Sequence, residues 1–260
     1  WKEIIDDLNS DPSITCLRVF YCELDDSVAE IIAEARHLTK INLSHNNITA
    51  IGANKLIELP LTELILIGNP IDTPIENLVS SKIPKLNFCA CHHIGRKNLR
   101  YLFENPNIIE LYLSEVCIKD KDLQYLKNNI TLKKLEISNC GAITFNGMEY
   151  IANTSIETLD LSDNLYIGNI GIKNLSSNKS LLSLSISQMG ITDVCINDLI
   201  KIPKLSHVDA TLNNFSFHGI SILKGHFKHV SVSSTNGHYM CSFIDSLSLV
   251  KSARSVYSDN

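Results

Sequence analysis

The sequence lacks a surplus of positive charge and a long apolar run. Its 23 Lys and Arg residues are outnumbered by 28 Asp and Glu residues, which gives a formal net charge of −5. Nucleic acids and anionic membranes bind proteins through basic surfaces, so neither is expected as a partner. No apolar run approaches the length of about 18 residues that a membrane-spanning helix needs, so no such helix is expected.

The sequence from Trp1 onward also contains no recognisable secretory leader and so gives no information on targeting. It begins at Trp1, with no basic and apolar segment before a cleavage site. Eight cysteines are present, but the paired cysteines that cap extracellular repeat proteins are missing from both ends. Cys22, Cys91 and Cys140 stand at equivalent positions of the repeating pattern described below, where we expect burial. We therefore predict reduced thiols and a cytoplasmic location.

One spacing of apolar residues occurs twice between Ile156 and Ile191. It starts at Ile156 and again at Leu181, 25 residues later. Apolar residues stand at positions 1, 4 and 6 of each unit, position 9 favours a small polar residue such as Asn164, and another apolar residue stands near position 11. This is the leucine-rich-repeat pattern L-x-x-L-x-L-x-x-N/C-x-L.

The same pattern fits ten times along the chain, at intervals of 22 to 25 residues. The units start at Ile14, Leu38, Leu61, Ile83, Ile108, Leu132, Ile156, Leu181, Leu205 and Phe227. Because no linker separates them, we expect a single domain over residues 1–260, with repeats over 14–239. A solenoid must cover its open ends, so residues 1–13 are expected to form an N-terminal cap and residues 240–260 a C-terminal capping helix.

Alternation within each unit predicts an α/β fold. Positions 3 to 7 should form a short strand with positions 4 and 6 inward and positions 3, 5 and 7 outward. The remaining residues suffice for a short helix, and a right-handed crossover makes the next strand parallel to the last. Since a helix is wider than the spacing of about 4.8 Å between strands, the stack must curve. We expect a leucine-rich-repeat horseshoe of about ten repeats, with a concave parallel β-sheet and convex helices.

Position 9 of each unit is expected to be buried and to bond the loop backbone. It is Asn in four units, Cys in three and Thr in one, but Val116 and Met189 occupy it in the fifth and eighth units. Asn can pair loop backbone groups that burial would leave unsatisfied. Because Val and Met cannot do so, we predict altered loops or compensating water at those two turns.

Two connectors suggest a subtype of repeat. The segments 51–56 (IGANKL) and 167–178 (IGNIGIKNLSSN) resemble the I-G-x-x-G-A-x-x-L-A-x-N pattern of ribonuclease-inhibitor-like and GALA-type repeats. The chain is similar to the short repeat proteins that bacteria such as Legionella deliver into host cells. The Cys-x-Asp signature of bacterial repeat-containing ubiquitin ligases is absent from the sequence, so the resemblance does not imply that activity.

The resemblance implies a non-enzymatic protein–protein interaction module. As a translocated effector, the chain would act in the host cytosol by docking on a host protein. An alternative is that it binds and occludes another effector enzyme as a stoichiometric inhibitor. The chain is expected to be a monomer when free.

Two groups of residues could in principle carry chemistry. The segment Cys89–His93 (CACHH) is capable of binding metal, but strand alternation should send Cys89 to the concave face and Cys91 into the core. Cys89, His207 and Asp209 could form a nucleophilic site only within hydrogen-bond reach, whereas they lie on the fourth and ninth repeats. No glycine-rich phosphate loop follows a predicted strand. We therefore expect no enzymatic activity, metal site or cofactor.

The outward strand positions are the candidate partner-binding surface. Large apolar side chains collect in the first three units and charged ones rim them, which is typical of an interface. The candidates are Arg18, Phe20, Tyr21, Ile65, Ile67, Glu110, Tyr112, Glu115, Glu136 and Asp160. Glu110, Glu136 and Asp160 are expected to form an acidic row that attracts a partner protein with a basic surface.

Overall fold

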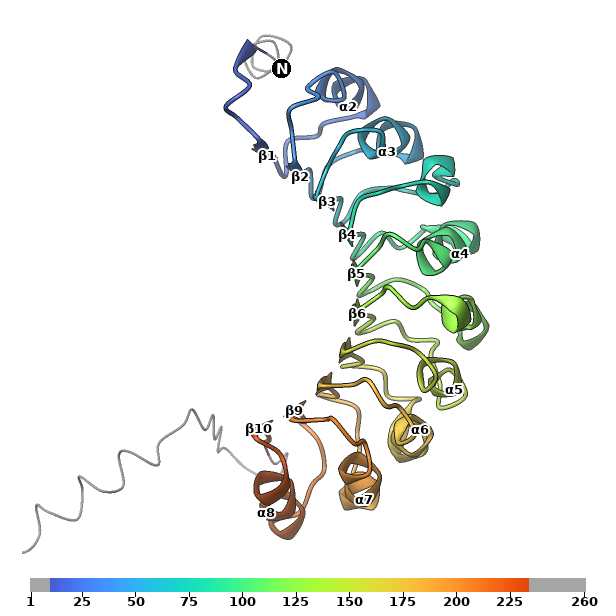
Figure 1. The fold of residues 1–260 in the computed structure, drawn as a ribbon, viewed down its shortest axis with the longest axis vertical. Helices are drawn as coiled ribbons and strands as arrows, with labels where there is room; N and C mark the ends of the chain where they lie inside the picture. The colour runs from blue at the N-terminus through green and yellow to red at the C-terminus, as the bar shows by residue number, and fades with distance from the viewer. Residues whose placement is uncertain (1–9, 234–260) are drawn as a thin grey trace, which may run out of the picture.

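The computed structural model describes residues 10–233 of the chain. These residues form an arc whose inner edge is a parallel sheet and whose outer edge is a series of short helices (Figure 1). This is the predicted horseshoe. Most of the expected N-terminal cap, residues 1–9, and all of the expected C-terminal capping helix, residues 240–260, lie outside the described residues.

Ten strands of three residues each form one sheet in the order of the sequence. They are β1 (Cys16–Arg18), β2 (Lys40–Asn42), β3 (Glu63–Ile65), β4 (Lys85–Asn87), β5 (Glu110–Tyr112), β6 (Lys134–Glu136), β7 (Thr158–Asp160), β8 (Ser183–Ser185), β9 (His207–Asp209) and β10 (His229–Ser231). Each starts at position 3 of a predicted unit, and equivalent positions of neighbouring strands are paired. The ten predicted repeat starts are therefore confirmed over the described residues.

Helical segments cover the convex side. They are α2 (Asp26–Ile32), α3 (Ala50–Ile57), η1 (Glu76–Val79), α4 (Gly95–Glu104), η2 (Asp120–Asn128), α5 (Met148–Ile151), α6 (Gly168–Leu175), η3 (Asp193–Cys195), α7 (Ile196–Ile200) and α8 (Phe217–His226). The η segments are 3₁₀ helices, which wind more tightly than α-helices. Helical segments of such different length are compatible with one regular sheet, because the connection in each unit has only to bring the next strand beside the previous one.

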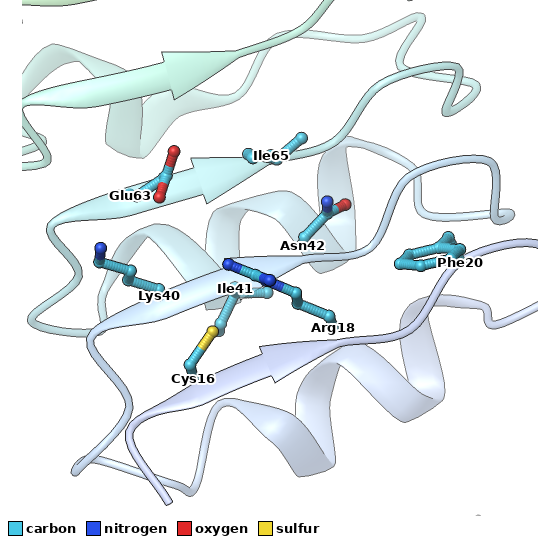
Figure 2. Close-up of a pocket in the computed structure, with 8 residues that line it drawn as sticks. All are labelled: Cys16, Arg18, Phe20, Lys40, Ile41, Asn42, Glu63 and Ile65. Atoms are coloured by element: carbon cyan, nitrogen blue, oxygen red, sulfur yellow. The ribbon is translucent and has the colours of Figure 1, made fainter.

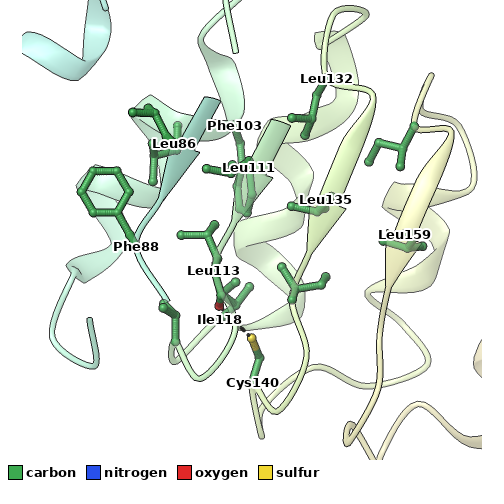
Figure 3. Packing of buried hydrophobic residues seen from close by; sticks show 14 of the residues in the cluster. Leu86, Phe88, Phe103, Leu111, Leu113, Ile118, Leu132, Leu135, Cys140 and Leu159 are labelled. Carbon is green, nitrogen blue, oxygen red and sulfur yellow. Dashed lines mark hydrogen bonds between the residues drawn. The ribbon is translucent and has the colours of Figure 1, made fainter. Parts of the chain in front are cut away.

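The core lies between the sheet and the helices. Positions 4 and 6 of successive units stack as continuous apolar layers, for example Leu86, Leu111 and Leu135 (Figure 3). These side chains are fully buried, whereas their neighbours at positions 3 and 5 face the concave side. Because each unit buries its apolar face only against its neighbours, the stability of the fold depends on contacts between consecutive repeats.

Carboxylates of one repeat also hold the start of the next helix. Asp26 accepts hydrogen bonds from the Thr49 and Gly52 amides at 2.8 and 2.9 Å and from the Thr49 hydroxyl at 2.6 Å. A Cβ atom at Gly52 would lie 2.5 Å from the Asp26 carboxylate, so glycine is required there. Asp120 bonds the amide and hydroxyl of Thr144 in the same way. These bonds couple neighbouring helices as the sheet couples neighbouring strands.

A left-handed turn follows each of the first nine strands, at position 8 of the unit. The φ angle is positive there in the first nine units, at Tyr21, His45, Gly68, Ala90, Glu115, Asn139, Asp163, Gln188 and Leu212. Only one of the nine is glycine, although other residues adopt this conformation at a cost. The shared turn therefore arises from the stacking of repeats rather than from local sequence preference.

The asparagines at position 9 bond the turn of the preceding unit as well as their own. Asn164 accepts a hydrogen bond from the Cys140 amide at 3.0 Å and donates to the Ile137 and Leu161 carbonyls at 2.8 Å. Asn213 similarly accepts from the amides of Met189 and Ile191. The expected altered loop at Met189 is wrong, because Gln188 before it has the usual positive φ of 55°.

The turn at Val116 is not altered either, because Glu115 has the φ of 61° that is usual at position 8. Cys91 and Cys140 are buried as predicted, and the Cys140 thiol donates to the Leu113 carbonyl (Figure 3). Cys22 is exposed, which corrects the expectation of burial. It belongs to the first unit, so no described repeat packs against its outer side.

We expect the substitution Asn164→Ala to lower the free energy of unfolding by about 3 kcal/mol, because it leaves several buried backbone groups without partners. Chemical denaturation with urea would measure this change. Asn153→Ala is the matched control, since Asn153 is exposed and makes one longer bond of 3.3 Å. Equal effects of the two substitutions would contradict the role of the position 9 amide.

The cysteines provide a second prediction. Burial raises the pKa of the Cys91, Cys140 and Cys195 thiols to about 12, whereas Cys16 and Cys117 are exposed. Since the thiolate is the reactive form, the three buried thiols should be alkylated on the order of a hundredfold more slowly in the native protein. Peptide mass spectrometry after timed alkylation would measure the rates. Denaturant should equalise them, and equal rates in the native protein would refute the burial.

Candidate protein-binding surface

The outward side chains of the concave sheet form three rows. Paired strand positions define the first row, at position 3, and the second row, at position 5. The third row, at position 7, follows the strands. The first row runs Cys16, Lys40, Glu63, Lys85, Glu110, Lys134, Thr158, Ser183, His207 and His229. The second runs Arg18, Asn42, Ile65, Asn87, Tyr112, Glu136, Asp160, Ser185, Asp209 and Ser231.

A hollow of about 280 Å³ opens on the first three strands. Figure 2 shows the Arg18 side chain extending from β1 over β2, with Lys40 and Glu63 on one side and Phe20 and Ile65 towards the ends of the strands. Phe20 is 51% exposed and Ile65 is half-buried. The structure thus brings together the predicted residues Arg18, Phe20 and Ile65. Ile67 is also half-buried but does not line this hollow.

Tyr21 and Glu115 do not lie on the strands, which corrects their predicted placement. Both occupy position 8 of the turn, with φ angles of 57° and 61°. The Tyr21 ring is 73% exposed and stacks on the His45 ring of the next repeat, with centroids 4.4 Å apart. The His45 ring lies over Gly68, where a Cβ atom would come within 2.5 Å of it. The two stacked rings, with Gly68 beneath the His45 ring, form an aromatic pair in the turns that follow β1 and β2.

Ion pairs neutralise the charges in the middle of the concave face. Lys85 Nζ lies 2.9 Å from the Glu63 carboxylate and 3.7 Å from that of Glu110. The hydrogen bond to Glu63 raises the pKa of Lys85. Lys134 pairs with Glu136 at 3.1 Å and lies over the ring of Tyr112. Sequence reasoning missed both lysines, although the alternating signs along the first row are readable in the sequence.

Tyr112 belongs to the same central network. Its hydroxyl donates a 2.8 Å hydrogen bond to Glu110, and its side chain is half-buried between charged neighbours. Burial and the bond to the Glu110 carboxylate raise the pKa of the Tyr112 hydroxyl. This predicted contact residue is therefore engaged within the sheet rather than presented as an isolated apolar anchor.

The predicted acidic row is wrong for Glu110. Glu110 stands in the first row opposite Lys134, whereas Glu136 and Asp160 face each other in the second row. Glu136 is engaged by Lys134, but Asp160 forms no ion pair with a described residue and accepts only the Ser162 amide. Asp209, further along the second row, accepts the Thr211 amide in the same way. Uncompensated acidity therefore lies in the C-terminal half of the face.

A second hollow, of about 180 Å³, opens on β8, β9 and β10. The rings of His207 and His229 stack there with centroids 4.3 Å apart, and Asp209 lines the same hollow. Sequence reasoning considered His207 and Asp209 only as partners of Cys89. Their strand lies five strands from β4, a separation of about 24 Å at the usual spacing, which is far beyond hydrogen-bond reach.

The Cys89–His93 segment splits as its alternation predicts. Cys89 is half-buried on the concave side, whereas Cys91 is fully buried and its thiol donates to the Leu66 carbonyl at 3.2 Å. His92 Nδ1 lies 2.9 Å from the Glu115 carbonyl oxygen. Within residues 10–233, no three His, Cys, Asp or Glu side chains are arranged to hold a metal ion. No helix in this part of the chain has the length and apolarity required to cross a membrane.

Comparison with known proteins agrees with the repeat geometry. A family model described as a leucine-rich repeat matches residues 34–56, 128–152 and 152–176, which are less than a third of the chain. A chain of the yeast Rad7–Elc1 complex is similar in structure, with a TM-score of 0.58 and 15% identity over 90% of this chain and 75% of that chain. An internalin from Listeria monocytogenes has a TM-score of 0.56 and 19% identity, over 92% and 71% of the two chains.

At these identities the two structures are informative about the fold alone. They agree with the sequential order of ten parallel strands and with the alternation of strand and helix along the chain. The described part of this protein is therefore a leucine-rich-repeat solenoid.

Proposed function

We propose that this protein is an interaction module that binds a partner protein on its concave face. The observation that carries the proposal is the N-terminal hollow, where Phe20 and Ile65 present apolar surface beside Arg18 and Lys40. Solenoids use such extended concave surfaces for binding. Aromatic anchors in partly enclosed sites supply much of the binding energy of protein interfaces.

Several properties of the chain favour this role over catalysis. The candidate nucleophile Cys89 and base His207 lie on distant strands, and burial raises the pKa of the Cys89 thiol, which makes it less reactive. The leucine-rich repeat is itself typical of binding scaffolds. The free protein is proposed to be a monomer.

The resemblance of the connectors to those of translocated bacterial proteins supports a role in a host cytosol, by docking on a host protein. The alternative is occlusion of an effector enzyme. Titration of a bound enzyme with the purified chain would distinguish the two, because occlusion requires loss of activity at one-to-one stoichiometry. Binding without loss of activity would favour recruitment.

We expect the substitutions Phe20→Ala and Ile65→Ala each to weaken partner binding by about 2 kcal/mol, or roughly 30-fold, with the melting temperature retained. Partners captured from eukaryotic lysates and from co-expressed bacterial proteins would be purified and measured by calorimetry. Val194→Ala is the matched control, since Val194 is 75% exposed on the convex segment η3. Binding lost in the control but kept in both concave variants would refute the proposal.

Because Asp160 and Asp209 have no ion-pair partner among the described residues, they favour binding of a basic segment of the partner at the C-terminal half of the face. Replacing both with Asn should slow association several-fold and flatten its dependence on salt, because partly exposed charges without an ion-pair partner mainly steer encounter. Replacing Glu110 and Glu136 with Gln should have a smaller effect, since Lys85, Lys134 and Tyr112 already engage those carboxylates. Stopped-flow association rates would compare the two double variants, and the reverse order would contradict this assignment.

A further inference from the structure

We propose that the N-terminal hollow recognises an acidic side chain that lies close to an apolar one on an extended segment of a partner protein. This inference deepens the proposed function, on which it rests, by naming the chemistry that one part of the concave face selects. The partner group expected at this end of the face is therefore acidic, whereas the acidic composition of the chain suggests a basic partner surface.

The two cations of the hollow are not compensated by any other described residue. Arg18 and Lys40 are both exposed, and neither forms an ion pair or side-chain hydrogen bond with a described residue. Lys40 stands opposite Glu63 in the register, yet the Glu63 carboxylate lies 2.9 Å from Lys85 on the other side. The central lysines of the first row are thus compensated, whereas the positive charge at the hollow is available to a ligand.

The apolar groups of the hollow lie at the opposite end of the strands from Lys40. Phe20 and Ile65 lie towards the carboxyl ends of the strands, and Lys40 lies at their amino ends (Figure 2). At about 3.3 Å per residue, the level of Ile65 is roughly 7 Å from that of Lys40 along the strands, and the level of Phe20 is roughly 13 Å away. An extended segment can span these distances with an acidic residue and an apolar residue two to four positions apart.

Charge complementarity selects a carboxylate for the cationic end. The Arg18 guanidinium presents a planar set of donors that matches a carboxylate, and Lys40 adds a second positive charge on the neighbouring strand. A nucleic acid would require a longer basic track. The first row instead continues into Glu63 and then Lys85, which pair with each other, so the uncompensated positive surface ends within the hollow.

The test uses the full chain and synthetic seven-residue peptides with blocked ends. Each peptide has a Gly–Ser framework with Glu at one position and Phe two, three or four residues later. Matched peptides carry Gln in place of Glu, or Ala in place of Phe. Binding would be measured by NMR titration, which detects weak complexes. We expect at least one Glu–Phe peptide to bind about tenfold more tightly than both of its matched peptides.

Protein variants locate the site. Arg18→Gln and Lys40→Gln should each remove most of the preference for Glu over Gln. Lys134→Gln should not, because Lys134 is already paired with Glu136. The double variant Arg18→Glu, Lys40→Glu should instead prefer peptides with Lys in place of Glu. This reversal would show that the charge at the hollow, rather than a change in folding, determines the selection.

Cys16 gives an independent readout because it lines the hollow opposite Lys40 and is exposed. A saturating Glu–Phe peptide should slow alkylation of Cys16 and leave exposed Cys117, on the fifth repeat, unaffected. The proposal is overturned if no peptide binds, if Gln and Glu peptides bind equally, or if Cys16 is not protected.

The failures of the two proposals are distinguishable. If partner binding requires Phe20 and Ile65 but is unchanged by Arg18→Gln and Lys40→Gln, the acidic preference is overturned. The proposal that the concave face binds a partner protein is then retained. The opposite outcome is that peptides bind selectively in the hollow while Phe20→Ala and Ile65→Ala leave the affinity for the protein partner unchanged. This outcome would overturn the proposed binding of the partner on the concave face.

Discussion

The turn that follows each of the first nine strands is the constraint on which the rest of the structure depends. It combines a left-handed residue at position 8 with a position 9 that is buried in the second to ninth units, and in four of these an Asn side chain bonds both its own loop and the preceding one. A non-glycine residue in this conformation has a conformational cost, and a buried backbone group without a partner has a larger one. The stack of repeats satisfies those groups, so each turn depends on its neighbours for its shape.

This dependence explains why a unit can lose its own amide. The turn at Met189 keeps the usual geometry, with a φ of 55° at Gln188, and Asn213 of the next unit accepts hydrogen bonds from the Met189 and Ile191 amides. With the same turn in the first nine units, each strand begins at the same position and the register of paired residues does not drift from β1 to β10. The outward positions consequently align in straight rows, where side chains can vary without affecting the core.

The apolar core and the strands could be predicted from the sequence because positions 4 and 6 repeat with little variation. The site was predictable only in part. Outward residues were identified by alternation, but alternation does not say where a strand ends, so Tyr21 and Glu115 were assigned to strands although they lie in turns. Charge partners depend on the register between repeats. Glu110 was expected in a row with Glu136, whereas pairing places it opposite Lys134.

The same register gives the concave face a direction. Along the first row, Lys and Glu alternate from Lys40 to Lys134, so each inner charge has a neighbour of opposite sign on both sides. Near β1 the alternation gives way to Cys16, and the positive charge of Lys40 is joined by that of Arg18. Beyond β6 the lysines stop, while Asp160 and Asp209 continue along the second row. A partner that covers the whole face therefore meets opposite charges at its two ends, which favours one orientation along the sheet over its reverse.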